Sequence, residues 1–285
     1  VRFRFDFFFF FLDYLIDMKY ISVVFASIIA IAFAYSHSAY VASQVAGRTS
    51  LWTPGEVTRF ASRQDFLNAI MSEIPETPRG YPVQQFVMND DLPDEFDSVD
   101  QWGDVCPKIG EVRDQQSCGS CWAFSSSESL GDRFCIATNG DLLQDEFLSP
   151  QWLVSCDPYD NGCNGGNGAR VGFFFKKDGT VTDDCDPYVS GDGVTIPECP
   201  NACADGSQPD RKYYGKSSTL IQGEEKMMDS IYTYGPIMVA FYVFEDFEAY
   251  TGGIYEHTWG SLLGGHGVEI VGWGVEDGTK YWRVK

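Results

Sequence analysis

The sequence predicts an α+β protein with two lobes, because its helical patterns come early and its strand patterns come late. From Leu92 to about Gly215 the chain is rich in glycine, aspartate and cysteine and holds a few helical stretches. After Gly215 one helical stretch is followed by three runs rich in β-branched and aromatic residues. This order indicates a helical lobe followed by a strand-rich lobe.

The clearest helix is expected over Cys121–Ala137, where an apolar run with few breakers follows Ser120, a plausible N-cap residue. Further helices are expected at 169–176 and 224–234, and Gly235-Pro236 stops the second of these. The expected strands are 237–243, 268–273 and 279–284.

The N-terminus predicts a leader. Lys19 gives a short basic start after Met18, and the apolar run Ile21–Ala34 ends in a small-x-small cleavage pattern. That run is too short to span a bilayer comfortably, so residues 18–39 are interpreted as a secretory signal peptide, with a retained anchor as the alternative. Residues 1–17 have no obvious role and are expected to be translated from upstream of Met18, unless the N-terminus is incomplete.

An amphipathic helix is expected between the leader and about Asp91. Thr53-Pro54-Gly55-Glu56 has the form of a capping box with proline at the first helical position. Apolar residues then recur at near-helical spacing from Val57 to Ile74, and prolines from Pro75 onward end the pattern.

Composition narrows the class of partner. The chain has 20 Lys+Arg and 41 Asp+Glu, a formal net charge of −21. Nucleic acid and anionic membranes would repel such a protein, which instead fits an acidic compartment. Secretion permits disulfides, so eight of the nine cysteines could pair and leave one free, although spacing alone does not decide the pairing.

Cys121 is the strongest candidate for a reactive residue. It stands at the expected start of a helix, where the positive end of the helix dipole favours thiolate over thiol. A thiolate nucleophile needs a partner that shuttles protons. Of the three histidines, His37 lies in the leader and His257 in a loop, whereas His266 follows two glycines at the opening of a strand-like run.

Three motifs occur in a recognisable order, in the segments 106–124, 161–166 and 264–275. With them the sequence resembles the papain family of cysteine proteases, and its cathepsin B-like members in particular, over roughly residues 50 to 285. The resemblance implies a papain-like fold with a helical left lobe, an antiparallel β-rich right lobe and the active-site cleft between them.

The resemblance also implies a role for each site residue. Cys121 would be the nucleophile, and His266 would hold the ion pair and then protonate the leaving amine. Gln115 would donate to the oxyanion beside the Cys121 backbone N–H. Water would hydrolyse the thioacyl-enzyme, and neither a metal nor an organic cofactor would be needed. The implied substrate-binding residues are Gly165, Gly166, Gly267 and Trp122.

The disulfides implied by the resemblance are Cys106–Cys135, Cys118–Cys163, Cys156–Cys199 and Cys185–Cys203, which leave Cys121 free. Residues 40–91 would be a propeptide that covers the cleft, with an ordinary N-terminal helix as the alternative, and processing near Asp91 would release 92–285 as the catalytic domain. The implied partners are protein or peptide substrates, the chain's own propeptide and cystatin-type inhibitors. The mature form would bind no membrane, and the chain would pass through the secretory pathway to a lysosome, a vacuole or the outside of the cell.

Three departures from the family pattern affect these expectations. Gln116 stands where the family usually has glycine. The interval 186–198 contains no histidine, whereas the matching loop of cathepsin B carries a pair that captures a substrate C-terminus, so endopeptidase activity is the better expectation. The asparagine that orients the histidine would follow Lys285, so the catalytic domain is expected to be truncated and this chain to be poorly active.

Three other interpretations remain open. Cys118 and Cys121 could form the redox pair of a thiol–disulfide oxidoreductase. A zinc site could use four cysteines, although the signal peptide and the irregular spacing favour disulfides. A secreted homologue could also keep the fold and act only as a binding protein. The four cysteines of the zinc alternative are Cys156, Cys163, Cys199 and Cys203.

Overall fold

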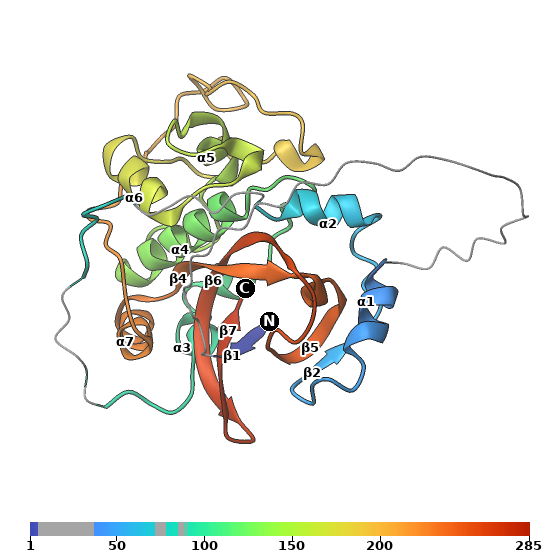
Figure 1. Ribbon diagram of the computed structural model, residues 1–285. Helices are drawn as coiled ribbons and strands as arrows, with labels where there is room; N and C mark the ends of the chain where they lie inside the picture. Colours follow the sequence, from blue (N-terminus) through green and yellow to red (C-terminus); the bar gives the residue numbers. More distant parts are fainter. Residues whose placement is uncertain (5–36, 72–77, 85–88, 90) are drawn as a thin grey trace, which may run out of the picture.

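The computed structural model describes residues 1–4, 37–71, 78–84, 89 and 91–285. In Figure 1 helices α4, α5 and α6 gather on one side of the molecule and the strands of the sheet on the other. The helices are α1 (His37–Val45), α2 (Arg63–Ala69), α3 (Ser98–Trp102), α4 (Cys121–Ala137), α5 (Pro150–Cys156), α6 (Gly168–Lys177) and α7 (Glu224–Tyr234). The strands are β1 (Arg2–Arg4), β2 (Trp52–Pro54), β3 (Phe96–Asp97), β4 (Ile237–Phe244), β5 (Tyr250–Tyr255), β6 (Leu262–Glu276) and β7 (Thr279–Val284).

Helix α4 is shared by the two lobes, because it packs on α5 and α6 on one side and on β4 and β6 on the other. Most of its residues are therefore buried, including several serines. The hydroxyls of Ser125 and Ser127 donate to the main-chain carbonyls of Cys121 and Phe124, which satisfies these polar groups inside the core. The first residue of the helix, Cys121, consequently lies at the boundary between the lobes.

The sheet has the order β2-β5-β1-β7-β6-β3, and β4 also pairs with β6. All of these pairs are antiparallel except β1 with β5. Strand β6 is the longest, and its register with β4 places His266 opposite Phe241. Asp277 and Gly278, with φ of 49° and 79°, make the tight turn between β6 and β7.

A buried ionic cluster adds to the contact between the lobes. The Lys285 Nζ lies 2.9 Å from a Glu269 carboxylate oxygen on β6, and 3.4 Å and 3.6 Å from Asp132 and Glu128 on α4. Burial raises the pKa of Glu128 to about 7, so this carboxyl is partly protonated near neutral pH.

Four disulfides join the cysteine pairs that the resemblance implies: Cys106–Cys135, Cys118–Cys163, Cys156–Cys199 and Cys185–Cys203. All nine cysteines lie in the described part of the chain, and Cys121 alone is free. The redox interpretation is therefore wrong for this structure, because Cys118 pairs with Cys163 and not with Cys121. The zinc interpretation is also wrong, because all four of its cysteines are in disulfides.

The expected helix from Thr53 onward is wrong in its extent. Residues 52–54 form β2, which pairs with β5, and the helix α2 begins only at Arg63. There the Ser62 hydroxyl accepts the backbone N–H of Asp65, so the true cap lies nine residues later than the predicted one. Pairing with a distant strand, together with burial of Trp52, outweighs the local capping pattern.

Residues 1–4 belong to the sheet. Strand β1 lies between β5 and β7, and Phe3 packs on Phe241 and Tyr255 in the core. The predicted signal peptide falls on residues 18–36, outside the described residues, and on residues 37–39, which begin α1. The division into 1–17, 18–39, 40–91 and 92–285 therefore stays a prediction.

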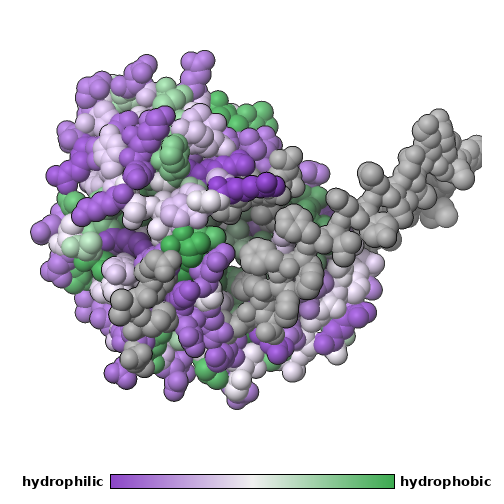
Figure 2. Space-filling view, turned by 60° about the vertical axis from the view of Figure 1, so that its left-hand side comes forward, coloured by the Kyte–Doolittle hydropathy of each residue, from purple (hydrophilic) through white to green (hydrophobic). Residues whose placement is uncertain are grey.

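The α+β class is confirmed. The expected helices over Cys121–Ala137 and 224–234 and the expected strand over 279–284 have the bounds of α4, α7 and β7. Strand β6 begins earlier than expected, so His266 lies inside the strand and not at its opening. The face shown in Figure 2 is mostly hydrophilic, with scattered hydrophobic residues, as expected for so acidic a chain.

Candidate active site

Cys121 begins helix α4 and is 1% exposed. Its Sγ accepts the backbone N–H of Gly267 at 3.2 Å, so the helix and strand β6 meet at the thiol. Ser120 occupies the N-cap position, but its side chain makes no cap hydrogen bond within the described structure. Its hydroxyl instead lies 2.9 Å from the hydroxyl of Tyr188.

His266 reaches the same place from β6, because it directly precedes Gly267. Its ring packs edge-on against Phe241 with centroids 5.8 Å apart. Its Nδ1 is buried and has no hydrogen-bond partner among the described residues. The fold thus brings the predicted nucleophile and the predicted proton shuttle into one neighbourhood, although they are far apart in the sequence.

The electrostatic state of this pair differs from the expectation of a depressed thiol pKa. Burial raises the pKa of Cys121 to about 11, and the N–H of Gly267 offsets only part of that effect. Burial, together with the smaller effect of the Arg59 charge, lowers the pKa of His266 to about 4. Both groups are therefore neutral in this structure, because a dry site cannot stabilise the two charges.

The segment Ala69–Met71 covers the site. The Met71 N–H donates to the carbonyl of Gly265 at 2.8 Å, and the Gly265 N–H donates back to Met71 at 3.0 Å. Met71 is completely buried and packs in one cluster with Cys121 and Trp122. The segment therefore adds a short piece of antiparallel pairing to β6 beside His266.

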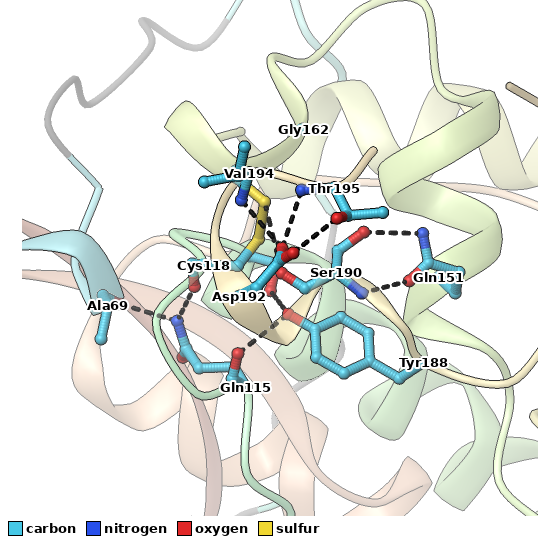
Figure 3. Close-up of a disulfide and its surroundings, with 12 residues drawn as sticks. Ala69, Gln115, Cys118, Gln151, Gly162, Tyr188, Ser190, Asp192, Val194 and Thr195 are labelled. Carbon is cyan, nitrogen blue, oxygen red and sulfur yellow. Dashed lines mark hydrogen bonds between the residues drawn. A yellow bond between two sulfur atoms is a disulfide. The ribbon is translucent and has the colours of Figure 1, made fainter. Parts of the chain in front are cut away.

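Gln115 contacts the covering segment directly. Its side-chain Nε2 donates at 2.7 Å to the carbonyl of Ala69 and at 2.7 Å to the carbonyl of Cys118, as Figure 3 shows. A peptide carbonyl oxygen of the chain itself thus occupies the amide that the sequence assigns to the oxyanion of a substrate.

Two of the predicted substrate-binding glycines, Gly166 and Gly267, pack closely against Trp122. A side chain at Gly166 would overlap the ring of Trp122, and a Cβ at Gly267 would lie 3.0 Å from the Trp122 backbone nitrogen. Trp122 itself is completely buried, and its indole N–H donates to the carbonyl of Gly162 at 2.9 Å. Trp122 therefore supports the loop that carries Gly165 and Gly166.

The Cys118–Cys163 disulfide attaches the same loop to the residues before Cys121. Beside it, the Gly119 N–H donates to the carbonyl of Cys163 at 3.0 Å. Gln116, which stands where the family usually has glycine, has a φ of 56°. The backbone thus keeps the left-handed conformation that glycine favours there.

Tyr188 is the residue of this site that sequence reasoning missed. Its hydroxyl donates to the main-chain carbonyl of Gln115 at 2.9 Å. No local pattern marks it, and the only available signal is its place three residues after Cys185, inside the interval that lacks histidines.

Known proteins are similar to this chain in both sequence and fold. The family described as papain family cysteine protease matches residues 92–285. Cathepsin B-like CP2 of Giardia intestinalis is 39% identical over 266 residues, covering 89% of this chain and 86% of that protein. Procathepsin B S9 from Trypanosoma congolense superimposes with a TM-score of 0.77 at 30% identity, covering 86% of this chain and 85% of that chain. Digestive procathepsin L2 from the larval midgut of Tenebrio molitor gives a TM-score of 0.63 at 27% identity, covering 82% of this chain and 73% of that chain.

These matches confirm the papain-like fold, with α5 and α6 in one lobe, the sheet in the other and α4 shared by both. The chain belongs to the papain family of cysteine proteases, among its cathepsin B-like members.

Proposed function

We propose that the chain is the zymogen of a cysteine endopeptidase that works through Cys121 and His266. The observation that carries the proposal is the Ala69–Met71 segment, which lies over a free thiol at a helix N-terminus and fills the amide of Gln115. Its solved relatives include precursors of cathepsins, which supports a propeptide in residues 40–91.

Removal of the covering segment changes the electrostatics of the pair. Water then reaches the site, so the desolvation that raises the thiol pKa and lowers the imidazole pKa is reduced. Arg59 precedes the covering segment, and its charge lowers the pKa of His266. Removal of Arg59 with residues 40–91 would therefore also raise that pKa. The helix dipole of α4 then favours a thiolate beside an imidazolium.

The chemistry follows from that ion pair. The Cys121 sulfur forms a bond to the carbonyl carbon of the substrate, and the carbonyl oxygen takes the electron pair as an oxyanion. Gln115 Nε2 and the Cys121 N–H donate to this oxyanion. The C–N bond then breaks as His266 passes its proton to the leaving amine, and a thioacyl-enzyme remains. Water attacks the thioester while His266 takes its proton, which releases the acid and restores the thiolate.

Internal cleavage is the proposed mode. The interval 186–198 supplies no histidine that could bind a substrate carboxylate. Substrates would therefore be protein or peptide chains without a requirement for a free C-terminus.

Passage through the secretory pathway is part of the proposal. Four disulfides require an oxidising compartment, and the strongly acidic composition suits a lysosome, a vacuole or an acidic secretion. Among the described residues no helix is long and apolar enough to cross a membrane. Cystatin-type inhibitors are proposed as partners because they act on the family that the chain belongs to.

The test is cleavage of unfolded protein and of internally quenched peptides by the full-length, acid-processed protein. Cys121→Ala and His266→Ala should each abolish cleavage. The control His257→Asn changes a partly exposed histidine that lies between β5 and β6 and contacts the buried Asp246, and it should retain activity. A wild-type protein that binds peptides without cleaving them would contradict the proposal and favour a binding protein.

A further inference from the structure

The segment that follows Cys185 packs against the loop 115–120, which joins the two proposed oxyanion donors, Gln115 and the backbone N–H of Cys121. The Ser117 N–H donates to the carbonyl of Gly191 at 2.9 Å, and the Tyr188 hydroxyl reaches the carbonyl of Gln115. Figure 3 shows Tyr188 beside Gln115, with the Gln115 amide pointing to Ala69. The loop 115–120 is thus hydrogen-bonded to the segment after Cys185 on the side that faces away from Ala69 of the covering segment.

The direction of these hydrogen bonds can be assigned. A carbonyl only accepts, so the single proton of the Tyr188 hydroxyl goes to the carbonyl of Gln115. The hydroxyl of Ser120, 2.9 Å away, must therefore donate to the Tyr188 oxygen. Burial raises the pKa of Tyr188 to about 12, so the phenol keeps this proton at every pH at which the protein would work. One hydroxyl consequently joins the main chain of Gln115 to the residue that precedes Cys121.

Tyr188 is itself held from several sides. Its ring packs edge-on against Phe124 of α4 with centroids 4.8 Å apart. The buried Gln151 of α5 accepts the backbone N–H groups of Val189 and Ser190 at 2.9 Å and 3.1 Å, and donates to the Ser190 hydroxyl at 2.9 Å. Because the phenol is held rigidly, its hydrogen bonds can fix the positions of Gln115 and Ser120.

The loop between Gln115 and Ser120 needs an external support. Gln116 adopts a left-handed φ of 56°, which costs a non-glycine residue about 1 kcal/mol. Its side chain lies against Gly191, where a Cβ would come within 2.5 Å of it. Contacts from the 188–191 segment therefore hold the loop in a conformation that its own sequence does not favour.

We infer that Tyr188 is a positioning residue for the oxyanion site, and that the segment between Cys185 and Cys199 acts as its brace. The inference rests on the proposed function, because it assumes that Gln115 and the Cys121 N–H stabilise an oxyanion. Tyr188 touches neither the substrate nor the thiol in this scheme. It fixes the distance between the two donors, which must be held to a fraction of an ångström to act together.

The test compares the full-length, processed wild-type protein with Tyr188→Phe and with the control Tyr159→Phe, which also deletes one phenol oxygen. The Tyr159 hydroxyl is exposed and accepts a hydrogen bond from the Nζ of Lys177 at 3.3 Å. Three quantities are measured: kcat and KM for a peptide, the inhibition constant of a peptide aldehyde, and the rate at which iodoacetamide alkylates Cys121. The aldehyde forms a tetrahedral adduct that needs the oxyanion donors, whereas alkylation by iodoacetamide forms no oxyanion.

Tyr188→Phe should lower kcat about ten-fold with KM within about two-fold, and should weaken the aldehyde by the same factor. Alkylation should stay within about two-fold of the wild-type rate, which also shows that the variant is folded. If the wild type is active and Tyr188→Phe is equally active, the inference is overturned but the proposed function is not. The same holds if Tyr188→Phe lowers the alkylation rate by the same factor as kcat. A folded wild type that cleaves no peptide would overturn the proposed function, and the inference with it.

Discussion

At the scale of single residues, Cys121 and His266 account for how the proposed precursor would remain inactive. A thiol with a pKa of about 11 and an imidazole with a pKa of about 4 cannot form an ion pair near neutral pH. The cause is burial of both groups, to which Met71 of the Ala69–Met71 segment contributes, and the carbonyl of Ala69 accepts a hydrogen bond from the amide of Gln115. In the proposed function the catalytic groups are thus already assembled, and the covering segment withholds both their charge and their oxyanion site.

Gln115 gives the prediction that belongs to this scale. In the processed protein Gln115→Ala should lower kcat about a hundred-fold, because one of two oxyanion donors is lost. The alkylation rate of Cys121 should hardly change, since that reaction needs no oxyanion donor. Steady-state kinetics and thiol labelling check this, with the exposed Gln144→Ala as the control. A parallel fall in both rates would contradict the assigned role.

Some residues of this candidate site can be predicted from the sequence and others cannot. Cys121, His266 and Gln115 could be predicted because each stands in a local motif with a recognisable spacing. Tyr188 could not, because its inferred role depends on a hydrogen bond to a carbonyl 73 residues away. The neutral state of the thiol could not be predicted either, since it depends on which distant segment covers it.

At the scale of elements, α2 is the structure that holds the covering segment in place. Arg63 begins this helix and contacts Glu245 and Glu248, each at 3.2 Å, in the short helical turn Glu245–Ala249. Glu248 is 5% exposed, so loss of its cation would leave a largely buried carboxylate with fewer partners.

Arg63→Met should therefore weaken the docking of residues 40–91. Added in trans to the processed protein, a peptide of these residues with this change should inhibit about ten-fold less tightly than the unchanged peptide. Arg48→Met is the matched control, because the Arg48 side chain contacts a carbonyl within the same segment. Equal inhibition constants for all three peptides would show that Arg63 does not anchor the segment.

The elements could be predicted where their signals are local. Helix α4 has an apolar run bounded by recognisable residues, and α7 is stopped by Gly235-Pro236, so both appear with the expected bounds. Strand β2 could not be predicted, because Trp52 pairs with Gly253 some two hundred residues away. A capping pattern at Thr53 carries no information about that partner.

At the scale of the whole molecule, buried carboxyl groups set the pH dependence of stability. Burial raises the pKa of Asp157 and of Asp186 to about 6, and that of Asp160 to about 7. At these three carboxyl groups the folded chain therefore binds more protons than the unfolded chain between about pH 4 and pH 7. Since the unfolded state binds fewer protons in this range, these groups lower the free energy of unfolding as the pH rises through it.

The midpoint of thermal unfolding should accordingly be lower at pH 7.5 than at pH 4.5. Asp160→Asn should reduce the difference between the two pH values, because the amide does not ionise. Asp210→Asn, a change at an exposed position, should leave the difference as it is. Calorimetry of each protein at both pH values provides the comparison, and a midpoint that rises toward neutral pH would contradict this account.

The most direct test of the central claim is the rate at which iodoacetamide labels Cys121, measured from pH 4 to pH 10 before and after the removal of residues 40–91. The precursor should label slowly at acidic pH, because its thiol pKa is about 11. The processed protein should label rapidly near pH 5, where a thiolate beside an imidazolium already exists. Identical profiles for the two forms would contradict the claim that the covering segment controls the ionisation of Cys121.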